Sequence, residues 1–219
     1  MKKVLPIIFI AASLLTLTLV GCSNADIFKA KSYTSDDGIK SVFIDVSDRM
    51  IDIVASGDNN IHIEYYDGEK EYLDITESED KELSVKLTFN KNWTDFIGKK
   101  AAAEYRKITV KLPENLISLT VKTTNEAIKI KRFAYAATVK INNIGGNIEF
   151  EKISVGSSLE LTAKNGNILG SVLGDSDEFN IKCTVKKGDT NLPAEKNGGA
   201  KSLNVNCNNG DIIITFEEH

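Results

Sequence analysis

Hydrophobic and polar residues alternate with a period of two through most of the chain from Ser41 onward, which is typical of strands with one buried face. Helical spacing is nearly absent, and only residues 99–107, with three consecutive alanines, predict a short helix. The pattern therefore predicts an all-β domain in which residues 90–107 form an insertion. The clearest alternating segments of the first half are residues 42–46, 61–65, 83–89 and 108–112.

The second half of the chain repeats a strand, a small polar turn and a second strand. Its five units align on one corner residue, and the successive intervals are 20, 20, 22 and 22 residues. Asn or Asp follows the corner in the last four units, and a fixed period near 20 is typical of a repeat array. The corner residues are Glu126, Gly146, Gly166, Gly188 and Gly210.

Two architectures fit this repeat. Gly-containing turns can close two-residue hairpins, which would give an antiparallel β meander or sandwich. Alternatively, each unit of about 20–22 residues is one coil of a parallel β-solenoid, with the glycine at the same corner of every coil. The solenoid is favoured because the apolar positions agree in phase: Val121, Ile141, Leu161 and Val205 precede the corner, and Ile128, Ile148, Ile168 and Ile212 follow it.

Two units depart from the consensus. Glu126 stands where the others have Gly, and a non-Gly residue at positive φ is uncommon, so the first corner is expected to bend differently or to be mildly strained. Thr190 replaces the isoleucine of the fourth unit, which predicts looser packing there.

The first residues carry a different pattern. Lys2 and Lys3 precede 17 residues without a charge, and a basic start, an apolar core and small residues at the exit indicate a secretory signal peptide. The run Leu19-Val20-Gly21-Cys22 resembles the lipobox of bacterial lipoproteins, which implies lipid attachment to the Cys22 thiol and cleavage before it. An uncleaved membrane-spanning helix is the less favoured alternative, because a span needs about 20 apolar residues.

This interpretation divides the chain into a signal peptide (1–21), a lipidated tether (22–37) and a β-strand-repeat domain (38–219). Two or more acyl chains hold a protein stably on a bilayer. We therefore expect the mature chain on the bacterial cell membrane, facing outside the cytoplasm.

Charge and composition exclude several classes of function. The chain has 27 basic and 31 acidic residues, and removal of residues 1–21 takes away two lysines, which leaves 25 against 31, a net charge of −6. An acidic chain does not favour nucleic acid as a partner. Three Cys and two His are too few for a disulfide framework or a His-rich metal site, so we expect no cofactor and no metal.

The strand repeats are similar to the bacterial putative-adhesin family of β-strand-repeat domains, a domain of unknown function. The similarity rests on residues 108–113, residues 119–125 and the repeated Asn-Gly-Asn-Ile or Asn-Gly-Asp-Ile, and it covers roughly residues 40–216. It implies a right-handed, β-helix-like fold and a cell-envelope setting, and it implies no catalytic residues.

Four groups of side chains suggest chemistry, and each has a simpler explanation. Cys183 and Cys207 share the buried face of their strands as diagonal neighbours, so buried thiols are favoured over a disulfide. A solvated acidic turn is favoured over a calcium site at residues 175–178, and an exposed residue over a ligand at His62. Surface acids with a local ion pair are favoured over a glycosidase pair for Asp45, Asp48 and Asp52, which lie beside Arg49.

Trp93 and Phe96 interrupt the repeat within the insertion. Aromatic residues on a projecting loop can anchor a partner, which makes these two the candidate partner contacts. The alternative is that they fold back to cover an open edge of the solenoid.

Together these features predict a noncatalytic, adhesin-like module that binds an unidentified surface protein, glycan or membrane protein. A stack of coils offers long rigid faces, which suit such binding better than small-molecule chemistry. An accessory or regulatory partner of an envelope-stress or membrane protein is the first alternative. A carbohydrate-active enzyme is the second.

Overall fold

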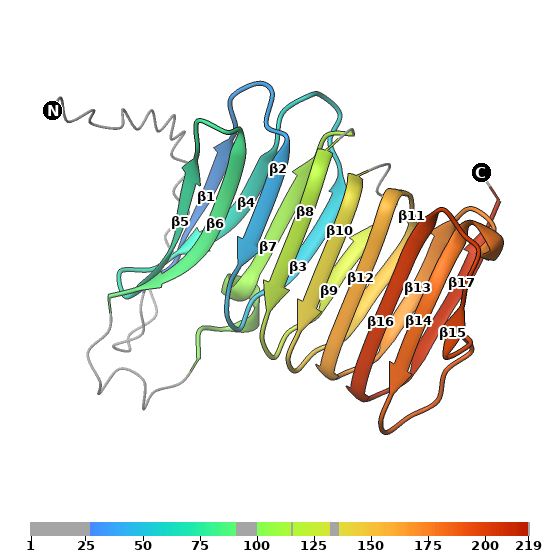
Figure 1. The fold of residues 1–219 in the computed structure, drawn as a ribbon. Coiled ribbons are helices and arrows are strands. Elements are labelled where there is room, and N and C mark those ends of the chain that lie inside the picture. Colours follow the sequence, from blue (N-terminus) through green and yellow to red (C-terminus); the bar gives the residue numbers. More distant parts are fainter. Residues whose placement is uncertain (1–26, 91–99, 115, 132–135, 219) are drawn as a thin grey trace, which may run out of the picture.

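The computed structural model describes residues 27–90, 100–114, 116–131 and 136–218, which form two β-sheets packed face to face (Figure 1). Sheet A contains, in spatial order, β1 (Lys29–Thr34), β4 (His62–Asp67), β7 (Lys107–Leu112), β3 (Met50–Ala55), β9 (Ile128–Lys131), β11 (Ile148–Ile153), β13 (Ile168–Leu173) and β17 (Ile212–Glu217). Sheet B contains β15 (Glu195–Lys196), β14 (Phe179–Val185), β16 (Lys201–Asn209), β12 (Val155–Asn165), β10 (Ala136–Asn143), β8 (Leu116–Thr123), β2 (Ser41–Asp45), β6 (Glu82–Phe89) and β5 (Glu71–Glu77).

The middle of the molecule is a regular solenoid. The chain passes from β8 in sheet B to β9 in sheet A, returns to β10 and β11, and returns again to β12 and β13. Each strand pairs in parallel with its equivalent in the next coil, so that Ile141 lies opposite both Val121 and Leu161. The parallel β-solenoid is therefore confirmed, and the antiparallel meander is wrong for this region.

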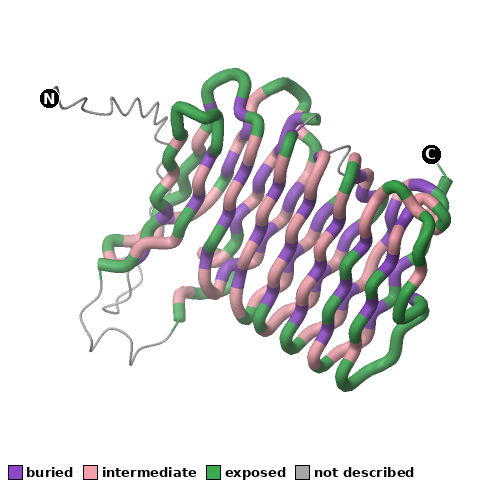
Figure 2. The backbone as a smooth tube through the Cα atoms, in the orientation of Figure 1, coloured by how far each residue is buried: buried purple, intermediate pink, exposed green. Residues whose placement is uncertain are grey.

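The core lies between the two sheets and follows the period-two pattern. Inward residues of the repeated coils, such as Ile128, Ile148 and Ile168, are completely buried, and their neighbours along each strand point outward (Figure 2). Full burial of a side chain of this size contributes about 1.5–3 kcal/mol, so the in-phase columns of Ile, Val and Leu supply the main stabilisation.

The order of coils differs from the order of the chain at both ends. In sheet B, β16 lies between β12 and β14, and β2 lies between β8 and β6. The fifth repeat unit therefore stacks on the third, and the fourth unit becomes the outermost. The extra residues of the 22-residue units bridge this longer path.

Antiparallel pairs are confined to the ends. At the amino-terminal end, β4 pairs with both β1 and β7, and β5 pairs with β6. At the other end, β15 pairs with β14. The sheets are thus mixed, and the stack is open rather than closed on itself.

Two predicted segments differ from the structure. Residues 29–34, assigned to the tether, form strand β1, because Tyr33 turns inward and packs against the core. The helix predicted over 99–107 is a single 3-10 turn, η2 (Ala103–Arg106), because the chain at Ala102 is extended. Cys22, Trp93 and Phe96 lie outside the described residues.

Candidate functional site

The corners of the coils stack so closely that a side chain has no room. A Cβ atom on Gly146 would collide with the carbonyl oxygen of Glu126, one on Gly166 with that of Gly146, and one on Gly210 with that of Gly166. Gly188 would collide with Gly210 in the same way. The predicted corner glycines thus form one column, in the spatial order Gly146, Gly166, Gly210 and Gly188. Gly210 comes before Gly188 because the fifth unit stacks on the third and the fourth unit is outermost.

Asn and Asp side chains run beside this column as a hydrogen-bond ladder. Asn147 Oδ1 accepts from the backbone N–H of Asn167 (2.9 Å), and Asn167 Oδ1 accepts from that of Asp211 (2.9 Å). Asp211 Oδ1 accepts in turn from Asp189 N–H (2.9 Å). The polar residues after three of the four corner glycines therefore have a structural role, since each satisfies a backbone donor of the neighbouring coil, and Asp189 ends the ladder.

Glu126 ends the glycine column and keeps its side chain. Its carboxylate pairs with Arg106 at the end of η2, and the positive φ of this corner belongs to Asn125 (59°). The first corner is thus bent differently from the others, as predicted, and Asn tolerates this conformation better than most residues.

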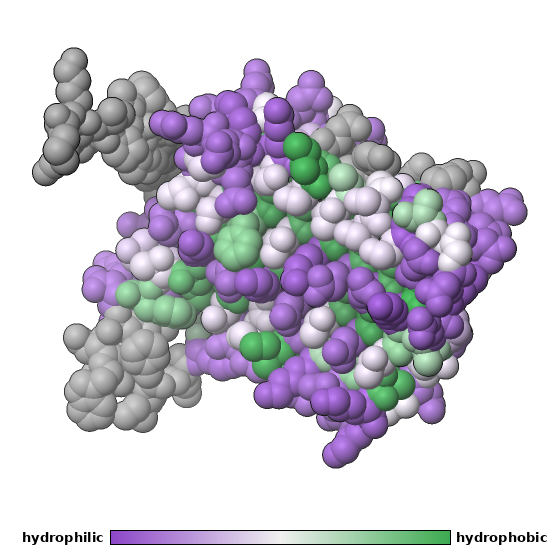
Figure 3. Space-filling model, in the orientation of Figure 1, coloured by the Kyte–Doolittle hydropathy of each residue, from purple (hydrophilic) through white to green (hydrophobic). Residues whose placement is uncertain are grey.

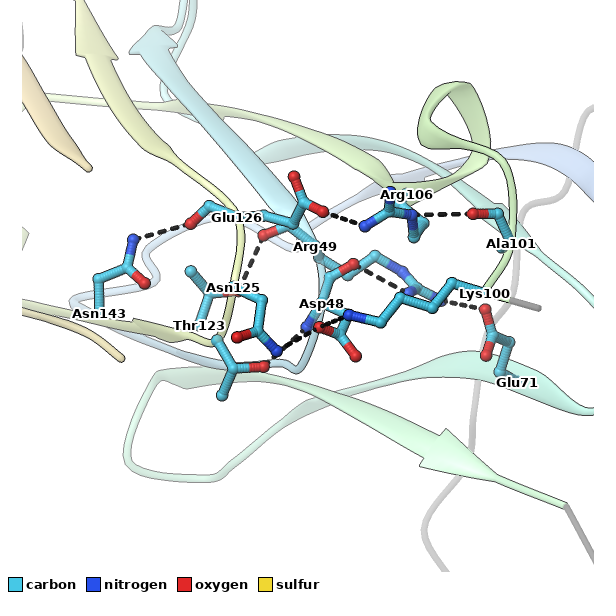
Figure 4. A network of polar contacts seen from close by, with 11 residues as sticks. Asp48, Arg49, Glu71, Lys100, Ala101, Arg106, Thr123, Asn125, Glu126 and Asn143 are labelled. Atoms are coloured by element: carbon cyan, nitrogen blue, oxygen red, sulfur yellow. Dashed lines mark hydrogen bonds and ion pairs between the residues drawn. The ribbon is translucent and has the colours of Figure 1, made fainter. Parts of the chain in front are cut away.

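A network of polar contacts extends from this corner to the base of the insertion (Figure 4). Asp48 lies in the turn between β2 and β3 and accepts hydrogen bonds from Lys100 Nζ (2.8 Å) and Asn125 Nδ2 (2.7 Å). Burial alone would raise the pKa of Asp48, but these two hydrogen bonds outweigh it and lower that pKa below its ordinary value. Asp48 is therefore an ionised structural acceptor.

Arg49 and Glu71 form a buried ion pair next to Asp48. Arg49 Nη2 lies 2.7 Å from Glu71 Oε1, and the two side chains are only 4% and 8% exposed. Loss of one partner from such a pair typically costs about 3–5 kcal/mol, because the other charge stays buried. The pair ties the start of β3 to β5 across the inside of the molecule, so the predicted pairing of Arg49 with its neighbouring acids is wrong.

The three acids considered as a catalytic group are kept apart. Asp45 lies on β2 in sheet B, 3.6 Å from Lys122 Nζ, whereas Asp52 lies on β3 in sheet A, 2.8 Å from Lys107 Nζ. Because the two strands belong to opposite sheets, their outward carboxylates face away from each other. A glycosidase needs both carboxyl groups around one bond, and this arrangement does not provide that.

The other candidate ligands are also engaged structurally. Asp175 caps the 3-10 turn η3 (Ser176–Glu178), and Asp177 and Glu178 pair with Lys196 and Lys201. His62 lies on the outward side of β4, where its Nε2 is 2.9 Å from Asp58 Oδ1. Among the described residues, no group of three or more His, Cys, Asp or Glu side chains is placed to hold a metal.

Cys183 and Cys207 are buried free thiols, as favoured from the sequence. Cys183 lies opposite Val205 and Cys207 opposite Val185, so the two are diagonal neighbours. Burial raises the pKa of the Cys207 thiol, which lowers its reactivity. The thiols therefore pack as small apolar groups.

The outward face of sheet B extends over nine strands. Its residues alternate with buried ones and align across parallel strands, and they mix short polar side chains with charged ones such as Lys140 and Glu160. Many hydrophilic residues lie on the face shown in Figure 3. One row combines hydroxyl and amide groups of β2, β8, β10, β12, β16 and β14: Ser41, Ser118, Thr138, Ser158, Ser202 and Asn180.

Two aromatic residues stand on this face, Phe43 of β2 and Tyr72 of β5. The ring of Phe43 has Lys122 Nζ 4.9 Å and Lys86 Nζ 5.9 Å from its centroid. The face therefore offers many hydrogen-bonding groups and two aromatic contacts. It can bind an extended polar partner, and its geometry is unlike a pocket for a small substrate.

The family is decided by a comparison of the whole domain. Residues 39–219 match the model of the family described as Toastrack DUF4097. The chain belongs to this family. The predicted resemblance to a bacterial family of unknown function is thereby confirmed, and the match begins next to the predicted domain boundary at residue 38.

Solved structures with similarity to this chain come from bacteria. A "putative cell adhesion protein" of Clostridium sporogenes ATCC 15579 matches this Toastrack domain with a TM-score of 0.62 and 11% identity, over 86% of this chain and 100% of that chain. A "putative adhesin" of Bacteroides fragilis NCTC 9343 gives a TM-score of 0.38 at 11% identity, over 90% and 100% of the two chains. At this identity the first likeness shows a shared fold.

Two further findings concern curated relatives and membrane-spanning helices. No curated protein sequence matches this chain. In the part of the chain that the structure describes, no helix is both long and apolar enough to cross a membrane.

Proposed function

We propose that this Toastrack protein is a lipid-anchored, noncatalytic adhesin-like module of the bacterial envelope, and that the outward face of sheet B is its binding surface. The observation that carries the proposal is the continuous row of Ser, Thr and Asn side chains across six neighbouring strands of sheet B, on a face that also carries Lys and Glu side chains. Strands about 4.8 Å apart present these groups at regular intervals, which suits a protein or glycan with its own repeated polar groups.

Anchoring is the second part of the proposal and rests on the sequence. Acylation of Cys22 would place the domain outside the cytoplasm, on the membrane. The name of the Clostridium structure, a "putative cell adhesion protein", supports the adhesive role by analogy of fold. The separation of Asp45 from Asp52 supports a noncatalytic role.

Binding can be tested with beads that carry the purified domain. Beads coated with residues 23–219 should bind host cells, extracellular matrix or bacterial envelope fragments above the level of uncoated beads. Replacement of Thr120, Thr162 and Asn206 by Lys would place bulky charges across the face, and it should reduce binding to that of uncoated beads. Lysine at Thr109, Ile213 and Thr215, on the outward side of the opposite sheet, adds the same charge and provides the control.

Equal loss of binding in both triple variants would contradict the assignment to sheet B. No binding by the unmodified domain to any of these surfaces would contradict adhesion itself. For the anchor, Cys22→Ala should release the protein from membranes or leave the precursor uncleaved, and unchanged membrane attachment and mobility would contradict lipidation.

A further inference from the structure

An aromatic cluster lies at the corner where the described chain begins. The ring of Phe28 stacks on that of Tyr105, with centroids 5.2 Å apart and planes 9° apart. Tyr66 meets Tyr105 edge to face at 5.4 Å. All three rings are partly exposed, and Ile27 beside them is 73% exposed. We call Phe28, Tyr66 and Tyr105 the entry cluster.

The entry cluster belongs to the outermost corner of the amino-terminal end. Gly68, in the turn between β4 and β5, lies against the Phe28 ring, and Tyr105 is part of η2. A shallow hollow of about 470 Å³ adjoins the cluster, lined in part by Lys31, Tyr66 and Lys107. Aromatic rings, lysine stems and a hollow thus share one corner of sheet A.

The short segment between Cys22 and Phe28 limits how far the entry cluster can lie from the bilayer that holds the lipid anchor. Only five residues lie between Cys22 and Phe28, and the six steps from one to the other, at 3.3–3.6 Å each, span at most about 22 Å. The nine strands of sheet B, at about 4.8 Å each, make the stack roughly 38 Å long. A lipid-anchored chain must therefore keep its amino-terminal corner close to the bilayer, whereas its other end can stand away from it.

The geometry points to the entry cluster as a membrane-contacting surface, which rests against the headgroup region of the bilayer that carries the lipid anchor. Tyr and Trp side chains favour this interface because their rings are apolar and their tips are polar. Phe28 adds apolar area, and the proposal rests on the lipidation of Cys22 proposed above. The solenoid then stands on its first coils and displays the outward face of sheet B along its side.

Charge does not drive this contact. Lys31 lies 3.1 Å from Asp67, Lys107 lies 2.8 Å from Asp52, and Lys111 lies 2.8 Å from Glu64. Because each of these three lysines has an acidic neighbour, they form no unpaired basic patch for anionic lipid. The contact is therefore expected on neutral and anionic bilayers alike.

Fluorescence quenching by brominated lipid tests the proposal. The full-length, lipidated protein is reconstituted into phosphatidylcholine vesicles, with and without phosphatidylcholine brominated near the top of its acyl chains. Trp93→Phe removes the native tryptophan, and Tyr105→Trp then reports on the entry cluster. Ile213→Trp, on the exposed side of β17 at the far end, is the matched control, since Ile213 is 49% exposed.

We expect brominated lipid to quench Tyr105→Trp and to leave Ile213→Trp unchanged, in neutral vesicles and in vesicles with added phosphatidylglycerol. Tyr66→Trp gives the same readout if Tyr105→Trp does not fold. Equal quenching at the two ends, or none at either end, in protein that floats with the vesicles would overturn the membrane contact. Protein that carries no lipid by mass spectrometry and does not float would instead overturn the anchor itself.

Discussion

Close stacking at the corners is the strongest constraint on single residues. Gly166 has φ +149°, a conformation that side chains rarely adopt, and its Cα faces the carbonyl oxygen of Gly146 in the next coil. The same contact recurs along the column, so each corner glycine holds two coils at the normal strand spacing. A side chain at this position would both strain the backbone and push the coils apart.

We predict that Gly166→Ala lowers the free energy of unfolding by about 2–4 kcal/mol, the sum of backbone strain and overpacking. Gly57→Ala is the control, because a Cβ atom there meets nothing within 4 Å. Its effect should stay within about 0.5 kcal/mol. Urea unfolding followed by circular dichroism measures both, and equal midpoints for the two variants would contradict the role of the column.

Two partly buried tyrosines at the amino-terminal end have raised pKa values, so we predict that the protein loses stability at alkaline pH. Burial raises the pKa of Tyr65 to about 12, with a smaller effect of the Asp67 charge. Burial also raises the pKa of Tyr33, helped by its hydrogen bond to Glu77. In the unfolded chain both titrate near 10, so above about pH 10 the tyrosines of the unfolded state ionise first, and this lowers the free energy of the unfolded state relative to the folded state.

The contribution of these tyrosines to the free energy of unfolding is thus fully present below about pH 10, and it decreases as the pH rises towards 12. Replacing both Tyr33 and Tyr65 by Phe should flatten this part of the stability curve. Tyr72→Phe, at a side chain that is 39% exposed, should leave the curve unchanged. Urea midpoints across this pH range provide the measurement, and the same slope in all three proteins would refute the prediction.

At the scale of elements, residues 189–191 cover part of the edge of the last strand of sheet A, through a backbone bridge at Ile212 and through the Asn191 side chain at Ile214. Asn191 Nδ2 donates to the carbonyl oxygen of Ile214 (2.8 Å), and Asn191 Oδ1 accepts from the N–H of Ile214 (3.0 Å). The side chain thus occupies the place of a further strand along the free edge of β17. Open edges invite pairing with other chains, and this contact blocks part of that edge.

Asn191→Ala should therefore free one donor and one acceptor of β17. We expect a loss of about 1–3 kcal/mol in stability and increased self-association. Asn197→Ala, which removes an exposed hydrogen bond to Glu195, is the control. Unfolding curves and size-exclusion chromatography at increasing concentration are the measurements, and a monomer as stable as the control would disprove a capping role.

The sequence predicted the elements unevenly, for physical reasons. Strands β8 to β13 were predictable because period-two alternation and in-phase stacking both constrain them. Strand β1 was not, because only Tyr33 of its six residues turns towards the core. The buried Arg49–Glu71 pair was missed, although Glu71 shares the inward side of β5 with Leu73, a signal that alternation alone does provide.

At the scale of the whole molecule, the terminal coils are interlocked. Strand β16 pairs with β12 on one side and with β14 on the other, although β14 precedes it in the chain. Repeat units of similar composition give no information on their spatial order, which is why the sequence could not reveal this exchange. Strand β14 consequently has no parallel neighbour until β16 is in place.

Deletion of residues 201–219 should therefore disrupt more than the last coil. We expect the amides of both β12 and β14 to lose protection from hydrogen exchange, because the deletion removes their common neighbour. Deletion of residues 23–37 removes only the edge strand β1, and it should lower the unfolding midpoint while β8 to β13 stay protected. If the amides of β14 exchange as slowly after the first deletion as in the undeleted protein, pairing with β16 does not stabilise β14.

The interlocked ends also affect how this architecture can change in length. A duplicated unit placed between β8 and β13 meets neighbours in chain order on both sides, so its strands can join the register of Ile128, Ile148 and Ile168. A unit added after β17 would instead have to enter beside strands that are already paired around an earlier segment. Longer relatives and engineered extensions should therefore gain their extra coils in the middle, and the two termini should be inherited as fixed end pieces.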